Sequence, residues 1–181
     1  MNQKLIFIAG PAGSGKSTLA NAVAKELEAT VLDLDEDQAV FLNLHETEIL
    51  ESGIETVLGK YRDSRYNELL GRVRSEVILG KSVIVTAPFT SEISNVENWK
   101  AIVAEFSALK VVPRLVWIRI NALLLKSRLL LRSEERDREK MSSAQSLKRY
   151  LDNSLRARPV VDYVEIDGEL PLAEQVKVTI R

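Results

Sequence analysis

A glycine-rich stretch near the start of the chain has the residue types and the spacing of a phosphate-binding loop. It reads Gly-Pro-Ala-Gly-Ser-Gly-Lys-Ser-Thr over residues 10–18, which satisfies the pattern G-x-x-x-x-G-K-[ST]. The glycines let backbone N–H groups turn toward phosphate oxygens. Lys16 supplies a charge for the β- and γ-phosphates, and Ser17 supplies a hydroxyl ligand for Mg²⁺. The loop therefore predicts binding of a nucleoside triphosphate. The loop residues that we expect to contact it are Gly10, Ala12, Gly13, Ser14, Gly15, Lys16, Ser17 and Thr18.

The residues on either side of the loop support this interpretation. Residues 5–9 form an apolar run of strand length, and apolar residues recur at helical spacing after the loop, at Ala20, Val23, Ala24 and Leu27. A strand, a glycine loop and a helix in this order distinguish a phosphate-binding loop from a chance match. The alternative is a plain glycine turn with a solvated lysine, and these flanks argue against it.

An acidic run follows the second expected strand, residues 31–34. Asp33 and Asp35 are two residues apart, so they share a face at the carboxyl end of the strand, where open parallel sheets bind ligands. A carboxylate there could bind Mg²⁺ or accept a proton from an attacking hydroxyl group. It could equally cap the next helix, for which Asp37 is the favoured residue. Asp35 is the stronger functional candidate, and Asp33 is evenly balanced between the two uses.

The third expected strand, residues 83–85, lacks the aspartate that many nucleotide-binding proteins carry at its tip. Thr86, Ala87 and Pro88 stand there instead. The missing acid moves the metal-linked carboxylate role onto Asp35.

The remaining pattern predicts helices that alternate with strands. Residues 36–80 are expected to be mostly helical, with a stop at Gly80, and to bind the acceptor. Ser94 and Glu97 have capping-box spacing, as have Ser142 and Gln145. A helix from Ala122 carries the apolar residues Leu123, Leu124, Leu130 and Leu131. Residues 111–120 and 160–167 hold the last two strands. Together these predict one domain over residues 1–181, with the α/β three-layer fold: a five-stranded parallel sheet with helices on both faces.

A basic segment lies in the last third of the chain. Between residues 126 and 149 there are eight lysines or arginines and four acids, whereas the whole chain has a net charge of −1. Arg128 and Arg132 are four residues apart, so one helical face can present both to a nucleotide. Positioned arginines stabilise the charge that develops in phosphoryl transfer. Alone, the segment would read as a solvated helix end. Beside a phosphate-binding loop, it predicts an arginine-rich lid over residues 132–142.

Composition narrows the class of protein. The chain has 181 residues, of which 45% are hydrophobic and 28% charged, and it has no cysteine. Disulfides and cysteine-based catalysis or metal binding are therefore excluded. The first apolar run is too short for a signal-peptide core, and no stretch has the length of a membrane span. We expect a cytoplasmic protein with no membrane partner.

These features together resemble a bacterial family of AAA-type ATP-binding proteins, similar to P-loop kinases of the shikimate, gluconate and chloramphenicol phosphotransferase kind. The resemblance rests on residues 10–18, Asp35, residues 61–64, residues 83–89 and the arginine series from residue 128 to Lys140. It implies a nucleoside-monophosphate-kinase-like fold. The chain lacks the second-strand Asp-Thr-Asp and the Gly-Gly turn of shikimate kinase and the fixed acceptor motifs of gluconate kinase, so the resemblance does not name the acceptor.

The resemblance also implies roles for single residues. Arg128 would lie against the adenine of ATP, and Arg132 and Arg136 would close over the β- and γ-phosphates. Asp35 matches the acid that meets the acceptor hydroxyl in shikimate-like enzymes. The turn that ends at Pro171 would flank the adenine from the other side. The residues that would face the acceptor are Arg62 with Asp63, and the turn that contains Pro88 and Phe89.

The expected activity is transfer of the γ-phosphoryl group of ATP, with Mg²⁺, to a hydroxyl group of a small molecule. The catalytic residues would be Lys16, Asp35, Arg132 and Arg136, and the metal ligands Ser17 and Asp35. One alternative is an ATPase or nucleotide switch that transfers to water. Another is a nucleic-acid 5′-end kinase, although the net charge of −1 and the lack of a basic stripe with interleaved aromatics argue against it.

Overall fold

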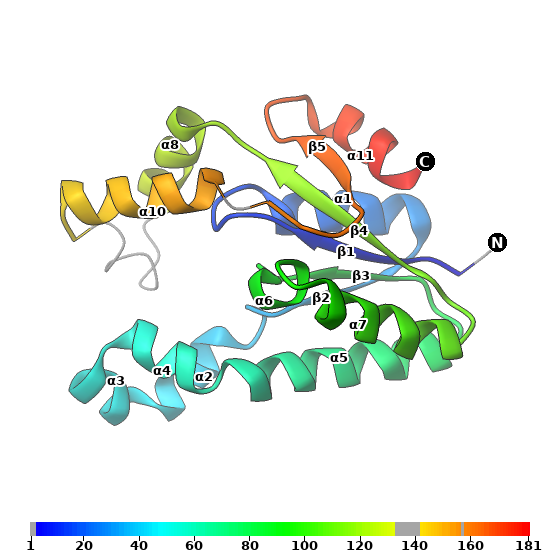
Figure 1. The fold of residues 1–181 in the computed structure, drawn as a ribbon, viewed down its shortest axis with the longest axis horizontal. Helices are drawn as coiled ribbons and strands as arrows, with labels where there is room; N and C mark the ends of the chain where they lie inside the picture. Colours follow the sequence, from blue (N-terminus) through cyan, green and yellow to red (C-terminus); the bar gives the residue numbers. More distant parts are fainter. Residues whose placement is uncertain (1–2, 133–141, 157) are drawn as a thin grey trace.

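The computed structural model describes residues 3–132, 142–156 and 158–181. A single sheet of five parallel strands in the order β2-β3-β1-β4-β5 runs through the molecule (Figure 1). The predicted α/β fold, with a five-stranded parallel sheet and helices on both faces, is confirmed. The strands are β1 (Leu5–Ala9), β2 (Thr30–Asp33), β3 (Val83–Thr86), β4 (Pro113–Arg119) and β5 (Val164–Asp167).

The central strand carries the phosphate-binding loop. β1 pairs with β3 on one side and with β4 on the other, so it is an interior strand of the sheet. Helices cover both of its faces. A strand in that position must be apolar on both faces, and each of its five residues is buried. The chain then leaves β1 through residues 10–15 and enters α1 (Lys16–Leu27). The loop is therefore held at the middle of the carboxyl edge of the sheet.

Two helical layers enclose the sheet. On one face α5 (Arg62–Ile78), α6 (Thr90–Ile93) and α7 (Val96–Ala108) pack over a core in which the ring of Phe7 lies 5.6 Å from Trp99 and 5.2 Å from Phe89. On the other face α1 and α11 (Leu172–Ile180) cover Ile6 and Ile8. Figure 1 shows these two layers above and below the sheet.

Two further groups of helices lie beyond the carboxyl ends of the strands, one toward each layer (Figure 1). The first group follows β2 and is connected to α5. The second lies beside the loop. Their bounds are α2 (Gln38–Leu44), α3 (Glu46–Ser52) and α4 (Ile54–Lys60) for the first group, and α8 (Ala122–Arg132) and α10 (Ala144–Arg156) for the second.

Several helix ends follow local chemistry that the sequence shows. The predicted stop after α5 is confirmed, because Gly80 adopts a positive φ of 77° just after the helix. The predicted cap of α7 was wrong by one residue. Asn95, and not Ser94, is the N-cap, and its side-chain oxygen accepts from the N–H groups of Glu97 and Asn98. Similarly, it is Ser143 that accepts from the N–H of Ser146 at the start of α10.

The leucines of α8 that are buried in the structure are not those that were named from the sequence as its apolar residues. Leu125 and Leu129 are fully buried, whereas Leu123 and Leu131 are 81% and 85% exposed. Seven of the eleven residues of α8 are apolar, so its leucines occur all round the helix and the pattern alone does not choose a face. The pair spaced by four residues is buried because it faces the phosphate-binding loop and α10.

Among the helices of residues 3–132, 142–156 and 158–181, none combines the length and the apolar character that crossing a membrane requires.

Candidate functional site

The phosphate-binding loop has the turned backbone that its glycines predict. Gly13 and Gly15 have φ values of 85° and 100°, which side-chain-bearing residues rarely adopt. The loop is tightened by a hydrogen bond from the Ser14 N–H to the Pro11 carbonyl, 3.1 Å long. α1 begins directly afterwards at Lys16, and the first N–H groups of a helix have no intrahelical acceptor. The loop and the helix start together form an anion site.

The two loop side chains that the sequence predicts to bind phosphate and Mg²⁺ have different partners. Lys16 folds back over the loop, and its Nζ donates to the carbonyl oxygens of Gly10 and Pro11, each at 3.0 Å. Ser17 Oγ points to the neighbouring strand and donates to Asp33 Oδ2 at 2.6 Å. A serine hydroxyl and a carboxylate in contact are the hard oxygen donors that Mg²⁺ prefers.

The three aspartates at and after the end of β2 have different partners. Asp33 also accepts the N–H of Asp35 at 3.0 Å, which holds its carboxylate against the loop. Asp35 Oδ1 lies 3.9 Å from Arg65 Nη2, and its side chain is 36% exposed. Asp37 precedes α2, but its side chain makes no capping bond there. The carboxylate that meets Ser17 is therefore Asp33, the acid that the sequence left evenly balanced.

These groups open into a pocket of about 540 Å³ at the carboxyl edge of the sheet. Among the residues expected to form the site, the lining includes most of the loop together with Asp35, Pro88 and Arg128. Asp33, Leu170, Leu172 and Gln175 also line it. The complete lining is Ala12, Gly13, Ser14, Gly15, Lys16, Ser17, Thr18, Asp33, Asp35, Pro88, Arg128, Leu170, Leu172 and Gln175.

Arg128 connects the loop to the turn between β5 and α11. Its Nη1 donates to the carbonyl of Ser14 at 2.8 Å, and its Nη2 donates to the carbonyl of Gly168 at 3.2 Å. Gly168 belongs to the turn between β5 and α11. A single planar guanidinium group thus bridges the loop and this turn.

α8 and α10 support the loop from outside the pocket. A Cβ placed on Gly13 would lie 3.2 Å from Leu125 Cδ1 and 3.3 Å from Leu129 Cδ2, so the loop backbone sits directly on α8. Tyr150 of α10 donates from its hydroxyl to the carbonyl of Ala12 at 3.2 Å. The leucines of α8 therefore act on the loop through packing.

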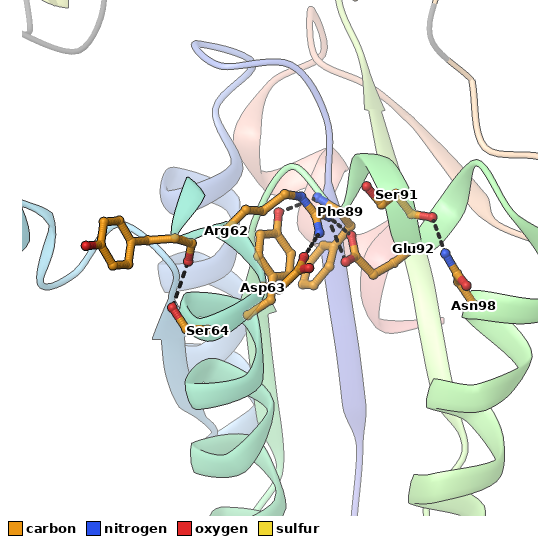
Figure 2. Close-up of polar contacts among 9 residues, drawn as sticks. Arg62, Asp63, Ser64, Phe89, Ser91, Glu92 and Asn98 are labelled. Carbon is orange, nitrogen blue, oxygen red and sulfur yellow. Dashed lines mark hydrogen bonds and ion pairs between the residues drawn. The ribbon is translucent and has the colours of Figure 1, made fainter. Parts of the chain in front are cut away.

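In the region that was expected to face the acceptor, carboxylates bind Arg62 (Figure 2). Its Nη2 donates to both oxygens of Glu92, at 2.8 and 2.7 Å, and its Nη1 donates to Asp63 at 3.2 Å. Burial alone would lower the pKa of Arg62, but the Glu92 carboxylate raises it above the ordinary value. The Asp63 side chain is 90% exposed. Arg62 thus joins α5 to α6.

Phe89 does not face an acceptor, and that expectation was wrong. Its side chain is fully buried against Phe7 and Tyr66, because β3 delivers it to the core of the α5–α7 layer. Its N–H donates to the Tyr66 hydroxyl at 3.1 Å, and the guanidinium of Arg62 lies 4.2 Å from the Tyr66 ring. Burial, with the Glu92 charge nearby, raises the pKa of Tyr66 to about 12. Pro88, one residue earlier, lines the pocket.

The other predicted residues are placed as follows. Pro171 precedes α11 but does not line the pocket, where Leu170 and Leu172 lie on either side of it in sequence. Gly10 contributes its carbonyl to Lys16. Arg132 ends α8, and Arg136 and nearly all of the predicted lid lie outside the described residues.

Sequence reasoning missed Asp33 as the partner of Ser17 and missed Gln175. For Asp33, the sequence held a signal. Asp33 shares a face with Asp35 and lies two residues earlier, at the last position of the strand. For Gln175, the signal was weak. It is a polar residue beside Val176, on a helix whose buried positions also include the polar Thr179, so the pattern does not single it out. Among the described residues, no group of three or more acidic or histidine side chains could hold a metal.

Comparisons with known proteins agree with this architecture. The family model described as an AAA domain matches residues 5–154. No curated protein sequence matches the chain. The chain is similar to the crystal structure of a putative kinase from Chloroflexus aurantiacus J-10-fl, with 17% identity, a TM-score of 0.70 and coverage of 97% of this chain and 93% of that chain.

Two further solved structures show the same fold. A gluconokinase from Sinorhizobium meliloti 1021 has 18% identity, a TM-score of 0.59 and coverage of 98% of this chain and 90% of that one. The APS kinase of Mycobacterium tuberculosis, in complex with AMPPNP and APS, has 18% identity, a TM-score of 0.62 and coverage of 99% and 96%. The predicted resemblance to P-loop small-molecule kinases is confirmed, and the fold is the α/β fold of P-loop kinases.

Proposed function

We propose that this chain, which belongs to the AAA domain family, is a kinase that transfers the γ-phosphoryl group of ATP to a hydroxyl group of a small molecule. One observation carries the proposal. The phosphate-binding loop, the contact of 2.6 Å between Ser17 and Asp33, and the carboxylate of Asp35 all open into the same pocket. A phosphate donor and an acceptor hydroxyl could therefore meet there.

The loop would hold the phosphates. The N–H groups of the turned backbone and of the start of α1 donate to phosphate oxygens, and Lys16 would exchange its two carbonyl partners for the β- and γ-phosphates. A compact ammonium on a flexible stem suits that exchange. Arg132 and Arg136 would close over the transferring phosphoryl group, as the resemblance implies, and so stabilise its developing charge.

Ser17 Oγ and Asp33 would hold Mg²⁺ with this chain's own oxygens, directly or through water. Bound there, Mg²⁺ neutralises charge on the β- and γ-phosphate oxygens. The small protein ligand set fits that ion, because Mg²⁺ usually takes one or two protein oxygens and fills its remaining positions with phosphate and water. Asp33 takes precedence over Asp35 here because the Ser17 hydroxyl donates to Asp33.

Asp35 would then serve the acceptor. Its carboxylate accepts the proton of the acceptor hydroxyl while that oxygen attacks the γ-phosphorus and the bond to ADP breaks. Arg65, at 3.9 Å, holds the Asp35 carboxylate in place. Pro88 also lines the pocket and would help to keep water from the reacting oxygen.

The test is ADP formation measured against a panel of hydroxylated compounds: neutral polyols, sugar acids, amino sugars and nucleosides. We expect at least one to raise ADP formation above the rate with water alone, and to appear as a phosphorylated product by mass spectrometry. Lys16→Ala should abolish this rate. Lys25→Ala removes the same charge from the exposed end of α1 and should leave it unchanged.

Two results would contradict the proposal. If ADP forms at the same rate with every compound, water is the acceptor and the chain is an ATPase or nucleotide switch. If only a short RNA or DNA 5′ end is phosphorylated, with salt-sensitive binding, the chain is a nucleic-acid kinase.

A further inference from the structure

The pocket wall formed by Leu170, Leu172 and Gln175, from α11 and the turn before it, is apolar apart from one amide. Leu170 and Leu172 are 38% and 40% exposed, and both line the pocket. The third residue contributed by this wall is Gln175 in α11, which is 8% exposed and is its one polar side chain. Apolar walls with a single placed polar group are typical of sites for flat aromatic ligands.

The amide of Gln175 is held in one orientation. Its Nε2 donates to the carbonyl of Leu170 at 2.7 Å. A carbonyl only accepts, so the nitrogen must face Leu170 and Oε1 must point elsewhere. No described residue donates to Oε1. The described side-chain atoms that are sealed from solvent without a partner are Ser14 Oγ and Thr86 Oγ1, so Gln175 Oε1 remains accessible.

Four backbone carbonyls beside this wall already accept hydrogen bonds. Carbonyl oxygens along the turn between β5 and α11 accept from this chain's own donors: Asp167 from Leu170, Gly168 from Arg128, Leu170 from Gln175, and Pro171 from Glu174 and Gln175. Of the three side chains that line the pocket here, those of Leu170, Leu172 and Gln175, only Gln175 can accept a hydrogen bond from a ligand.

We propose that Gln175 reads the base of the nucleotide, with Oε1 accepting from the 6-amino group of adenine while Leu170 and Leu172 cover the ring. This inference rests on the proposed function, because it places the triphosphate on the loop. A 6-oxo purine would set its oxygen against Oε1. The amide cannot turn round to donate instead, because Oε1 would then face the carbonyl of Leu170. The site thus prefers 6-amino over 6-oxo purines.

The test is calorimetric binding of ATP, inosine triphosphate and purine riboside triphosphate, with Mg²⁺. The second ligand carries an oxygen at position 6 and the third carries hydrogen. We expect the wild type to bind ATP about fivefold or more tightly than either, the value of one neutral hydrogen bond. In Gln175→Met, which keeps the size but not the amide, we expect the ATP advantage to fall to within about twofold of unity.

A matched control separates base reading from support of the helix. Thr179 is buried on the same helix, its hydroxyl donates to the Gln175 backbone carbonyl at 2.9 Å, and it does not line the pocket. Thr179→Val should keep the wild-type preference for ATP even where all three affinities shift together. A merely structural role for Gln175 would shift all three affinities equally in Gln175→Met.

The outcomes distinguish this inference from the function on which it rests. Wild-type protein that binds ATP but does not prefer it over purine riboside triphosphate overturns the inference alone, and this needs no variant to fold. An unchanged preference in Gln175→Met does the same. Absence of binding to every one of the nucleotides overturns the proposed function, and the inference with it.

Discussion

Asp33 and Asp35 leave the same strand end but meet different partners. The Asp33 carboxylate lies against the loop, where it accepts from Ser17 Oγ and from the N–H of Asp35. Asp35 extends past this contact and meets Arg65. Two carboxylates on one face can thus have different roles, because position along the strand decides which of them reaches the Ser17 hydroxyl. We propose that Asp33 binds the metal and that Asp35 accepts the proton.

Substituting each acid should separate these tasks. Asp33→Asn should raise the Mg²⁺ concentration needed for half-maximal activity by about 10- to 100-fold, the usual cost of losing a partner at a metal site. Asp35→Asn should leave that concentration unchanged and lower kcat about 100-fold. The measurement is a Mg²⁺ titration of kcat with the acceptor found in the screen.

Asp63→Asn is the control, because the same charge is lost from a side chain that is 90% exposed. We expect wild-type behaviour from it. The assignment is reversed if Asp35→Asn, and not Asp33→Asn, shifts the Mg²⁺ requirement.

The buried hydroxyl of Tyr66 predicts a loss of stability in alkali. Its pKa in the folded state is about 12, whereas an unfolded chain gives a tyrosine pKa near 10. Its contribution is complete below pH 10 and is lost as the pH rises from 10 through 12, because the unfolded state ionises first. Between pH 9 and 11 we expect about 1 kcal/mol of the free energy of unfolding to disappear for this reason.

Urea unfolding of wild type and Tyr66→Phe at both pH values measures this loss. The variant is expected to be less stable throughout, since the Phe89 N–H loses its acceptor, but its stability should fall less between the two pH values. Equal losses in both proteins would show that other groups carry the pH dependence.

At the scale of elements, the sequence predicted correctly the features that neighbouring residues determine, and it failed where residues distant in sequence determine the structure. The strand, loop and helix of residues 5–27 are encoded by neighbouring residues, and the structure places each as expected. The face of α8 was missed because its leucines surround the helix, and tertiary contact with Gly13 chooses between them. Phe89 was misplaced for a related reason. A residue just after a strand can turn to the core or to the pocket, and Phe7 and Tyr66 lie far from it in sequence.

The pocket wall formed by α11 and the turn before it could not be predicted from local sequence patterns either. Gln175 is 160 residues from Gly15, and no local pattern connects them. Their proximity depends on strand order, because β1 and β5 both flank β4, and on Arg128, which links the loop to the turn before α11. Pairing of distant strands and the reach of one arginine are properties of the folded chain.

The observed face of α8 leads to a direct test at this scale. Leu129→Ala should lower the free energy of unfolding by about 2–4 kcal/mol, because it opens a cavity under the loop. Leu131→Ala, two residues along the same helix, is 85% exposed and should change it by less than about 0.5 kcal/mol. Urea unfolding followed by circular dichroism measures both. If the two substitutions cost the same, α8 packs on a different face in solution.

At the scale of the whole molecule, residues that belong to or lead into both helical layers, together with a residue of α8, line the pocket. α1 and α11 belong to one face of the sheet, Pro88 leads into the other, and α8 and α10 form a separate small core around Leu125 and Leu129. That small core is tied to the rest through the loop, by packing on Gly13 and by the bond from Tyr150 to Ala12. A ligand on the loop therefore acts on the element that all three cores share.

Nucleotide binding should consequently stabilise the molecule as one unit. A non-hydrolysable ATP analogue with Mg²⁺, at 100 times its Kd, should raise the free energy of unfolding by about 2.7 kcal/mol. Trp99 and Trp117 are buried in the core of the α5–α7 layer, so their fluorescence reports that core, whereas circular dichroism reports all helices. We expect both signals to shift to the same higher urea midpoint, as a cooperative transition requires. A circular dichroism transition that moves with nucleotide while the fluorescence transition stays in place would mean that the cores unfold separately, and that the loop does not couple them.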